Sequence, residues 1–259
     1  MSLARRFALA RERARSRAHR ITVRRHHVPW PGLSPLRLVH LTDLHIGRAT
    51  PDAVLQTALA QTSLLRPDLV VLTGDYLNHS LKHIGELERF LRALPRPCVA
   101  SLGNHDHYSG VEVITGTIER HGIPVLRNNS QRVSLADGRV LEVVGVDDAF
   151  TGRHDVERAF DGVEDAASAL VLSHSPAAAD EIAARGGRLI LSGHTHAGQL
   201  NTPRIERAVK RLTRQRYIAG WYDLAHGARL YVNAGLGASA ISLRLGAAAT
   251  PEVALLELV

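Results

Sequence analysis

Short, mostly apolar segments that are each followed by polar residues recur along this chain and constrain its fold more than any other feature. They predict strands over residues 37–41, 69–72, 98–102, 169–172 and 189–191. The segments that follow them favour helices over residues 51–65, 81–94, 111–121 and 177–184. Strands that are apolar throughout and alternate with helices indicate a sheet covered on both faces. We therefore predict an α/β fold.

The remaining local signals extend this sheet without indicating a second folded unit. The further strands that we predict are an edge strand over 21–28, a hairpin over 131–135 and 139–146, and closing strands over 229–232 and 253–258. Thr50 suits the N-cap of the first helix, with Pro51 at its first position. Because 45% of the residues are hydrophobic, one large core is available. We expect residues 26–259 to form a single domain.

Candidate metal ligands follow the predicted strands. In chain order, the polar strand ends contain Asp43, His45, Asp75, Asn104, His105, His174, His194 and His196. Ligands of α/β sheets gather at the carboxyl ends of the strands, so these side chains are expected to converge. His194 and His196 stand two residues apart, and in an extended backbone such residues point the same way. Oxygen and imidazole donors without thiolate suit Mn, Fe or Zn, and there are enough for two ions when one carboxylate bridges them.

Each of these residues alone has an ordinary structural explanation. An aspartate before a turn usually caps a helix. The chain has fifteen histidines, and any single one of them is more often a surface or structural residue than a metal ligand. Five ordered groups, each at a predicted strand end, favour a metal site instead. Asp147 and Asp148 also follow a predicted strand, and we interpret them as support for the site or as helix caps without a catalytic role.

The positive charge of the chain is concentrated near its start. The formal net charge is +7 and the sequence pI is about 10.3, and residues 1–25 hold nine arginines against the single acid Glu12. We consider two structures for residues 1–25: a solvated, disordered basic tail, and an amphipathic helix on an anionic membrane surface with Leu3 and Phe7 inserted. Nucleic acid also attracts basic surfaces, but no binding motif and no aromatic stacking platform supports it here.

These features predict a cytoplasmic protein. The helix interpretation of residues 1–25 would attach it peripherally to the inner face of the cytoplasmic membrane, whereas the disordered tail would not. No apolar run approaches the roughly 18 residues that span a bilayer. Arg5-Arg6 lacks the apolar segment that a twin-arginine export signal needs. Cys98 is the one cysteine, which excludes an intramolecular disulfide, and it is expected to pack in a buried strand. No protein partner is predicted.

The candidate ligands resemble, in order and type, the motifs of the calcineurin-like metallophosphoesterases. The matching stretches are Asp43-Leu44-His45, Gly74-Asp75, Gly103-Asn104-His105-Asp106, His174 and Gly193-His194-Thr195-His196. The resemblance extends from about residue 37 to the end of the sequence. It implies a four-layer α/β/β/α sandwich with two divalent metal ions at the C-terminal ends of the strands. We expect Mn, with Fe or Zn as alternatives.

The same resemblance implies a role for each residue of the site. One metal would be held by Asp43, His45 and His196. The other would be held by Asn104, His174 and His194, with Asp75 bridging the two. His105 would not be a ligand but would stabilise or protonate the leaving oxygen. Because two metals about 3.5–4 Å apart lower the pKa of a shared water, the expected nucleophile is a metal-bridging hydroxide.

Further stretches are similar to the bacterial YkuE/YaeI-like branch of this superfamily. They cover residues 30–33, 40–45, 193–199 and 231–237. Some members resemble enzymes that split UDP-2,3-diacylglucosamine in lipid A synthesis, which implies a phosphodiesterase or pyrophosphatase with a membrane-associated substrate. Protein phosphatases of the superfamily carry aspartate and arginine where this chain has Asn78 and His79, which argues against a phosphoprotein substrate. The alternatives are a nuclease or cyclic-nucleotide phosphodiesterase and, more remotely, a non-catalytic scaffold.

A second basic segment follows the histidine pair and bears on the substrate. On a helix over residues 204–215, one face would carry Arg204, Arg207, Arg211 and Arg214, and the other Ile205, Val209 and Leu212. Two interpretations stay open. The helix either docks on the protein surface by its apolar side, or it caps the metals with its arginines toward a diphosphate or lipid headgroups.

Overall fold

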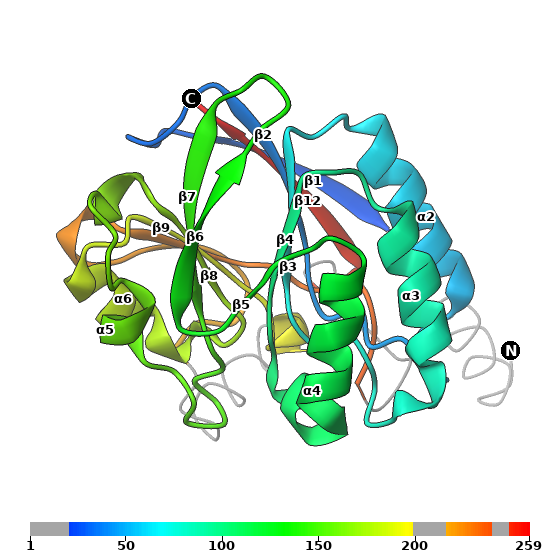
Figure 1. Ribbon diagram of the computed structural model, residues 1–259. Helices are drawn as coiled ribbons and strands as arrows, with labels where there is room; N and C mark the ends of the chain where they lie inside the picture. The colour runs from blue at the N-terminus through cyan, green and yellow to red at the C-terminus, as the bar shows by residue number, and fades with distance from the viewer. Residues whose placement is uncertain (1–20, 199–215, 240–248) are drawn as a thin grey trace, which may run out of the picture.

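Two mixed sheets form the centre of the computed structural model, which describes residues 21–198, 216–239 and 249–259 (Figure 1). The first sheet has the order β1 (Thr22–Val28), β12 (Glu252–Leu258), β2 (Leu36–Leu41), β3 (Leu69–Thr73), β4 (Cys98–Ser101) and β5 (Val125–Leu126). The second has the order β10 (Gly220–Asp223), β11 (Arg229–Val232), β9 (Leu189–Ser192), β8 (Leu170–Ser173), β7 (Val140–Val146) and β6 (Asn129–Ser134). Strands β2 to β5 are parallel to one another, as are β7, β8, β9 and β11.

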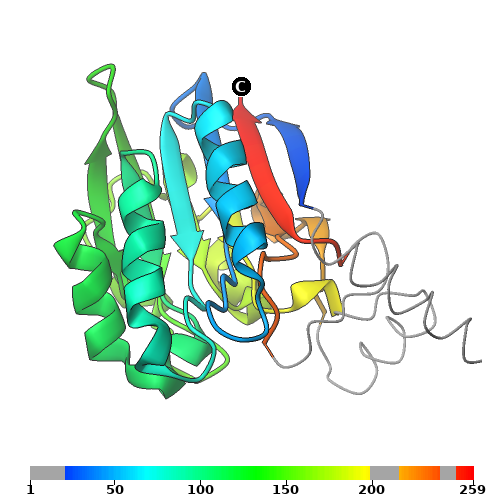
Figure 2. The same cartoon turned by 90° about the vertical axis from the view of Figure 1, so that its right-hand side faces the viewer.

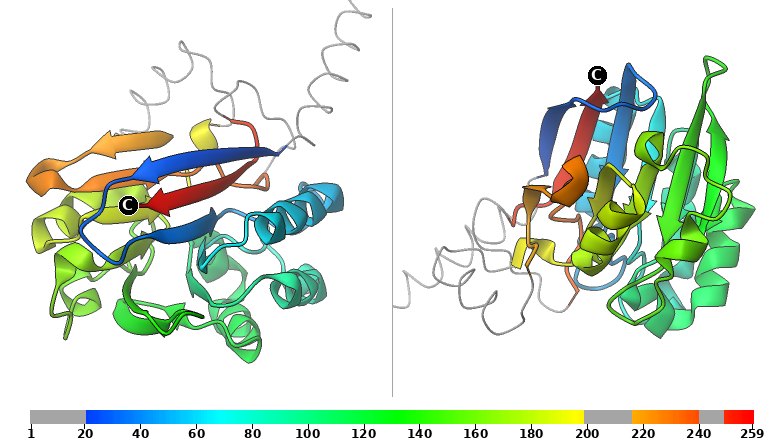
Figure 3. Two further views of the ribbon diagram at one scale, coloured as in Figure 1. Left: turned by 90° about the horizontal axis from the view of Figure 1, so that it is seen from above. Right: turned by 90° about the vertical axis from the view of Figure 1, so that its left-hand side faces the viewer.

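Helices cover the outer face of each sheet, which confirms the predicted four-layer α/β/β/α order. They are α2 (Asp52–Leu64), α3 (Ile84–Ala93), α4 (Asn104–Arg120), α5 (Val156–Ala159) and α6 (Ala179–Arg185). Helices α2, α3 and α4 pack on the first sheet (Figure 2), and α5 and α6 pack on the second (Figure 3). Within the described parts of the chain, no helix combines the length and the hydropathy that crossing a membrane requires.

Side-chain alternation along the strands assigns the apolar residues to separate packed layers. In β2, Leu36 and Leu38 contribute to the layer between the sheets, whereas Val39 and Leu41 pack against the helices. The second sheet behaves likewise, with Leu172 of β8 between the sheets and its neighbour Val171 against α6. Because the central strands are buried on both faces, they are mostly apolar, and the sequence pattern identifies them for that reason.

Helix α4 begins earlier than the sequence indicates. We expected a helix from residue 111, but α4 starts at Asn104 and continues through a kink at Gly110, where φ is 128°. The Asp106 carboxylate accepts the N–H of Gly103 at 2.9 Å, so the helix is capped at its first turn. Asn104 and His105 therefore stand on a helix end and not on a free loop.

One further expectation about the end of an element was wrong. The N-cap of α2 is Pro51, without a side-chain cap, and the Thr50 hydroxyl accepts the N–H of Ala238 at 3.2 Å instead. The strand predicted over residues 253–258 is confirmed as β12, and its place in the first sheet is set by distant partners. It is inserted between β1 and β2, parallel to the former and antiparallel to the latter.

A largely buried polar network joins the two sheets through β1, β11 and β12. Tyr231 of β11 lies in the layer between the sheets, and its hydroxyl makes a short hydrogen bond with the Glu252 carboxylate of β12. The other Glu252 oxygen accepts from Arg24 Nε at 2.8 Å, and His26 Nε2 of β1 is 3.0 Å from the Tyr231 hydroxyl. Burial raises the pKa of Glu252, whereas the hydrogen bonds from Tyr231 and Arg24 act to lower it. These bonds therefore offset part of the free energy that burying the carboxylate costs.

Replacing Tyr231 by phenylalanine should therefore destabilise the fold. The change leaves Glu252 and His26 each short of one buried partner, which we expect to lower the free energy of unfolding by about 1–3 kcal/mol. Urea unfolding at neutral pH measures this loss. Tyr217→Phe is the matched control, because its hydroxyl bonds Asp180 at 2.8 Å and that carboxylate is 53% exposed, so water replaces the lost bond. Equal losses in the two variants would contradict a special role for the network.

Candidate metal centre

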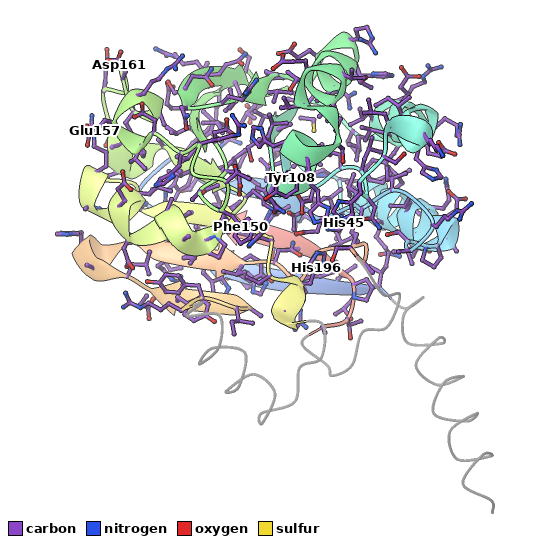
Figure 4. All side chains as sticks on the ribbon, turned by 90° about the horizontal axis from the view of Figure 1, so that it is seen from below. His45, Tyr108, Phe150, Glu157, Asp161 and His196 are labelled. Carbon is purple, nitrogen blue, oxygen red and sulfur yellow. The ribbon has the colours of Figure 1, made fainter. Side chains whose placement is uncertain are left out.

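The carboxyl ends of strands from both sheets deliver the candidate ligands to one end of the molecule, which faces the viewer in Figure 4. The first sheet contributes Asp43 and His45 after β2, Asp75 after β3, and Asn104 and His105 after β4. The second sheet contributes His174 after β8, and His194 and His196 after β9. All eight residues that the sequence singled out for the metal site and the catalytic position are thus gathered at this rim.

Asp43, His45 and His196 form one buried donor group. Their ligand atoms all lie within 4.8 Å of one another. His45 Nε2 and His196 Nε2 face each other at 2.9 Å, and Asp43 Oδ1 is 3.4 Å from His196 Nε2. Two imidazole nitrogens and a carboxylate that point at one place need a proton or a cation between them, since their lone pairs otherwise repel.

The Asp75 carboxylate stands between this group and the second sheet. Its Oδ2 is 3.5 Å from His45 Nε2 and 3.3 Å from His174 Nε2, while its Oδ1 accepts the N–H of His105 at 2.8 Å. His174 donates Nδ1–H to the carbonyl of Thr73 at 2.5 Å, which leaves Nε2 as the nitrogen that faces Asp75. That Nε2 is buried, and the Asp75 carboxylate is its neighbour across the gap between the sheets. A carboxylate in this position reaches donors from both sheets.

Asn104 and His194 meet on the other side of His174. Asn104 Oδ1 lies 2.8 Å from His194 Nδ1, and the His174 and His194 rings meet edge to face with centroids 5.2 Å apart. His194 belongs to the loop after β9 and Asn104 to the start of α4, so this contact joins the two sheets. The two histidines of the pair therefore point to different partners, His196 to Asp43 and His194 to Asn104.

His105 is partly buried at the entrance to the site. Its ring meets His45 edge to face, with centroids 4.6 Å apart, and the exposed His79 ring packs on it at 4.2 Å. Burial lowers the pKa of His105; Asp75 opposes this shift and His79 adds to it. One nitrogen of His105 also lies within 4.8 Å of ligand atoms of His45 and Asp75. Geometry alone therefore permits His105 to act either as a ligand or as a proton donor.

Asp106 holds the loops that carry these residues. Its buried carboxylate accepts three backbone N–H groups, from Asp75 at 2.8 Å, Tyr76 at 2.9 Å and Gly103 at 2.9 Å. Burial and the nearby Asp75 charge raise the pKa of Asp106 to about 7. These bonds tie the end of β3 to the start of α4, and so fix the position of Asp75 relative to Asn104.

The backbone at the rim is unusual in the way expected of functional sites. Asp43, His45, Asp75, His194 and His196 all have φ between 41° and 72°, the left-handed region that residues with a side chain rarely adopt. Gly193 permits the close approach of the β9 loop, because a Cβ there would collide with the Asp43 carboxylate. His194 N–H then donates to Asp43 Oδ2 at 3.1 Å. This packing holds the strained loops in place.

The electrostatics of the rim fit bound cations. Burial would raise the pKa of Asp75, but His174 and His45 hold it well below its ordinary value. Burial would lower the pKa of His174, but Asp75 raises it to about 10. Burial prevails at His45 and lowers its pKa well below the ordinary range. Because such ligands bind metal in their deprotonated forms, cation binding would displace the proton that His174 otherwise holds.

Further residues around the site support it, and the sequence indicated some of them but not others. Asp147 Oδ1 is 2.7 Å from His107 Nε2 and so ties β7 to α4, while Asp148 Oδ2 accepts the N–H of Thr151 at 2.7 Å and closes a turn. Both aspartates therefore support the rim, as the sequence suggested. The packing of His79 on His105 has no local signal. The arginines of residues 204–215 and nearly all of residues 1–25 lie outside the described residues.

Comparisons with known proteins agree with this geometry. The calcineurin-like phosphoesterase family matches residues 36–198. Similar proteins include phosphodiesterase YaeI of Escherichia coli, 33% identical over 87% of this chain and 83% of that protein, and the uncharacterised metallophosphoesterase YkuE of Bacillus subtilis, 31% identical over 86% and 78%. The UDP-2,3-diacylglucosamine pyrophosphatase LpxG of Chlamydia muridarum is 28% identical over 79% of each chain.

Two solved structures resemble the fold. A 5′-nucleotidase precursor from Thermus thermophilus has a TM-score of 0.52 at 19% identity, over 78% of this chain and 49% of that one. The NAD nucleotidase of Haemophilus influenzae has a TM-score of 0.51 at 17% identity, over 79% and 45%. The present chain spans about half the length of either structure, and the likeness concerns the fold alone.

If the rim binds divalent cations, they should stabilise the folded protein. Mn²⁺ at about one hundred times its Kd should add about 2.7 kcal/mol per site to the free energy of unfolding. The shift should shrink as the pH is lowered from about 8 to about 6, because protons compete for the ligands. Thermal unfolding with and without Mn²⁺ measures both effects.

Asp75→Asn should lose most of this shift, because the variant removes the carboxylate that faces both donor groups. His27→Ala is the matched control, since the His27 side chain is 75% exposed on β1 and lies outside the rim. A full Mn²⁺ shift retained by Asp75→Asn would show that the cation binds elsewhere.

Proposed function

Because this chain belongs to the calcineurin-like phosphoesterase family, a family of metal-dependent phosphoesterases, we propose that it is a dinuclear phosphodiesterase or pyrophosphatase. Its substrate would be membrane-associated, such as UDP-2,3-diacylglucosamine. The observation that carries the proposal is the position of Asp75, whose Oδ2 faces His45 of one donor group and His174 of another at 3.5 and 3.3 Å. A single carboxylate in that position suits a bridge between two cations.

The proposed ligand sets follow the two donor groups. One cation would be held by Asp43, His45 and His196. The other would be held by Asn104, His174 and His194, with Asp75 shared. When bound, two such cations would supply positive charge that stabilises the phosphoryl oxygens, and would lower the pKa of a water so that hydroxide is available at neutral pH. Donors of this kind, without thiolate, suit Mn best in our proposal, with Fe or Zn as alternatives.

His105 is the proposed general acid. It stands on the first turn of α4, and its backbone N–H donates to the Asp75 carboxylate at 2.8 Å. Its ring packs between the rings of His45 and His79. A ring that is fixed in this way at the edge of the site is positioned to protonate the oxygen that leaves when the phosphoester bond breaks. The exposed His79, whose ring packs on His105, stands at the position where the protein phosphatases of the superfamily carry arginine. This difference supports a substrate other than a phosphoprotein.

The substrate part of the proposal rests on relatives and on charge. LpxG, 28% identical, is named for UDP-2,3-diacylglucosamine, and YaeI, 33% identical, is named as a phosphodiesterase. The basic residues 1–25 and the arginines of residues 204–215 suit an anionic surface or a diphosphate. On this proposal the protein works at the cytoplasmic face of the membrane.

Replacing His105 by alanine should separate catalysis from metal binding. We expect the variant to keep its Mn²⁺-dependent thermal shift and its metal content, and to lose activity about a hundredfold to ten-thousandfold, the usual value of general acid catalysis. Steady-state kinetics together with elemental analysis of the purified variant measure both. Asn104→Ala is the comparison, because the loss of a proposed ligand should lower metal content and activity together. If His105→Ala lost metal in the same way, His105 would be a ligand.

A substrate panel tests the proposed activity. With Mn²⁺, the protein should hydrolyse UDP-2,3-diacylglucosamine with a higher kcat/KM than 3′,5′-cyclic AMP, single-stranded DNA or the chromogenic diester bis-p-nitrophenyl phosphate. Replacing Arg204, Arg207, Arg211 and Arg214 together by glutamine should raise KM for the lipid-linked substrate and spare the small diester. Equal effects on both would remove the cap interpretation of this segment. A preference for cyclic nucleotides or DNA would favour the alternative functions, and no hydrolysis of any substrate would favour a non-catalytic scaffold.

A further inference from the structure

Two exposed aromatic side chains stand beside the metal centre. Tyr108 is 60% exposed and Phe150 is 57% exposed, and they are the two aromatic members of the exposed large apolar side chains among the described residues. Each contacts a histidine of the site. The Phe150 and His194 rings have centroids 4.8 Å apart, and those of Tyr108 and His105 are 6.4 Å apart. Figure 4 shows both residues at the same end of the molecule as His45 and His196.

The fold fixes the positions of both rings. Phe150 sits in a tight turn after β7, where the Asp148 carboxylate accepts the N–H of Thr151 at 2.7 Å and the Asp148 carbonyl accepts that of Arg153 at 3.0 Å. Tyr108 follows His105 by three residues on α4 and so stands on the same helix face. A side chain that is more than half exposed yet anchored by its backbone presents a preformed apolar surface to solvent.

We propose that Phe150, with Tyr108 as a second wall, is a specificity-determining residue that stacks on a planar ring of the substrate, the base of a nucleotide whose phosphate lies at the metals. This inference rests on the proposed phosphodiesterase or pyrophosphatase function. Stacking on an aromatic face needs one flat, open ring, and Phe150 offers one next to His194. The base and the phosphate of one nucleotide would then be recognised by neighbouring residues of the same rim.

An extended alkyl chain fits these observations less well than a base. It needs a continuous apolar surface, yet three exposed aliphatic side chains of the described residues stand elsewhere. Leu64 ends α2, Val140 begins β7, and Val259 follows β12, all at the opposite end of the sheets. The fourth, Val113, lies beyond the kink of α4 at Gly110. Within the described parts of the chain, the apolar surface that borders the metals is aromatic.

Two probes with the same leaving group isolate the contribution of the base. Thymidine 5′-(p-nitrophenyl phosphate) carries a base, and methyl p-nitrophenyl phosphate does not, so the ratio of their kcat/KM values reports recognition of the nucleoside. We expect this ratio to fall about tenfold in Phe150→Leu, which keeps an apolar side chain but removes the ring. Phe150→Tyr, which keeps the ring, should retain the ratio of the unchanged protein. Leu64→Ala, an exposed apolar change at the far end of α2, is the control.

A binding measurement gives a readout that does not depend on turnover. By calorimetry on the full chain with Mn²⁺, thymidine 5′-monophosphate should bind more tightly than 2-deoxyribose 5-phosphate. Phe150→Leu should weaken binding of the nucleotide about tenfold, toward the affinity of the sugar phosphate. Tyr108→Leu should weaken it in the same direction by a smaller factor.

The outcomes distinguish the stacking proposal from the proposed function. A uniform fall in kcat for both probes would mean that Phe150 only positions His194, and would overturn the stacking proposal. Equal affinities of the unchanged protein for the nucleotide and the sugar phosphate would overturn it as well. If neither probe is hydrolysed but the nucleotide binds more tightly in a manner that depends on Phe150, the proposed function fails and the stacking site stands.

Discussion

The buried charge of Asp75 is the constraint on which the rest of this structure depends. A carboxylate in the interior is costly unless every side of it is satisfied. Asp75 draws on His105 at the start of α4, His45 in the loop after β2 and His174 of the opposite sheet. Those contacts require that strands of two separate sheets end at one place. The four-layer packing supplies this, because the apolar layer between the sheets brings β3 and β8 face to face and leaves their polar ends together at the rim.

The loops that follow the strands carry the candidate ligands in backbone conformations that other residues must stabilise. Five site residues adopt left-handed backbone conformations, which cost free energy that the surrounding bonds must offset. Asp106 supplies three of these bonds from one side chain, and the close contact of Gly193 with Asp43 fixes the other sheet's loop. The rim is thus a strained assembly that is held in part by Asp106, which is fully buried behind the candidate ligands, and by the close approach of Gly193 to Asp43.

The sequence predicts the parts of this molecule that follow from local pattern. Strands buried on both faces are mostly apolar, so most of them, and the polar residues at their ends, are identified correctly. It fails where the answer depends on a distant partner. The place of β12 depends on its pairing with both β1 and β2, which lie far away in the sequence. The start of α4 depends on the hydrogen bond from the Gly103 N–H to the Asp106 carboxylate, and the glycine at position 110 makes the sequence before it look non-helical. Phe150 and Tyr108 carry no pattern at all, and only proximity to His194 and His105 singles them out.

The insertion of β12 between β1 and β2 has a consequence for how the protein is made. The loop after β2 carries Asp43 and His45, and one edge of β2 stays unpaired until residues 252–258 have been synthesised. Pairing over more than two hundred residues is slow, since a long loop must close first. Until residues 252–258 emerge, the nascent chain therefore exposes an unpaired apolar strand edge next to the loop that carries two residues of the site.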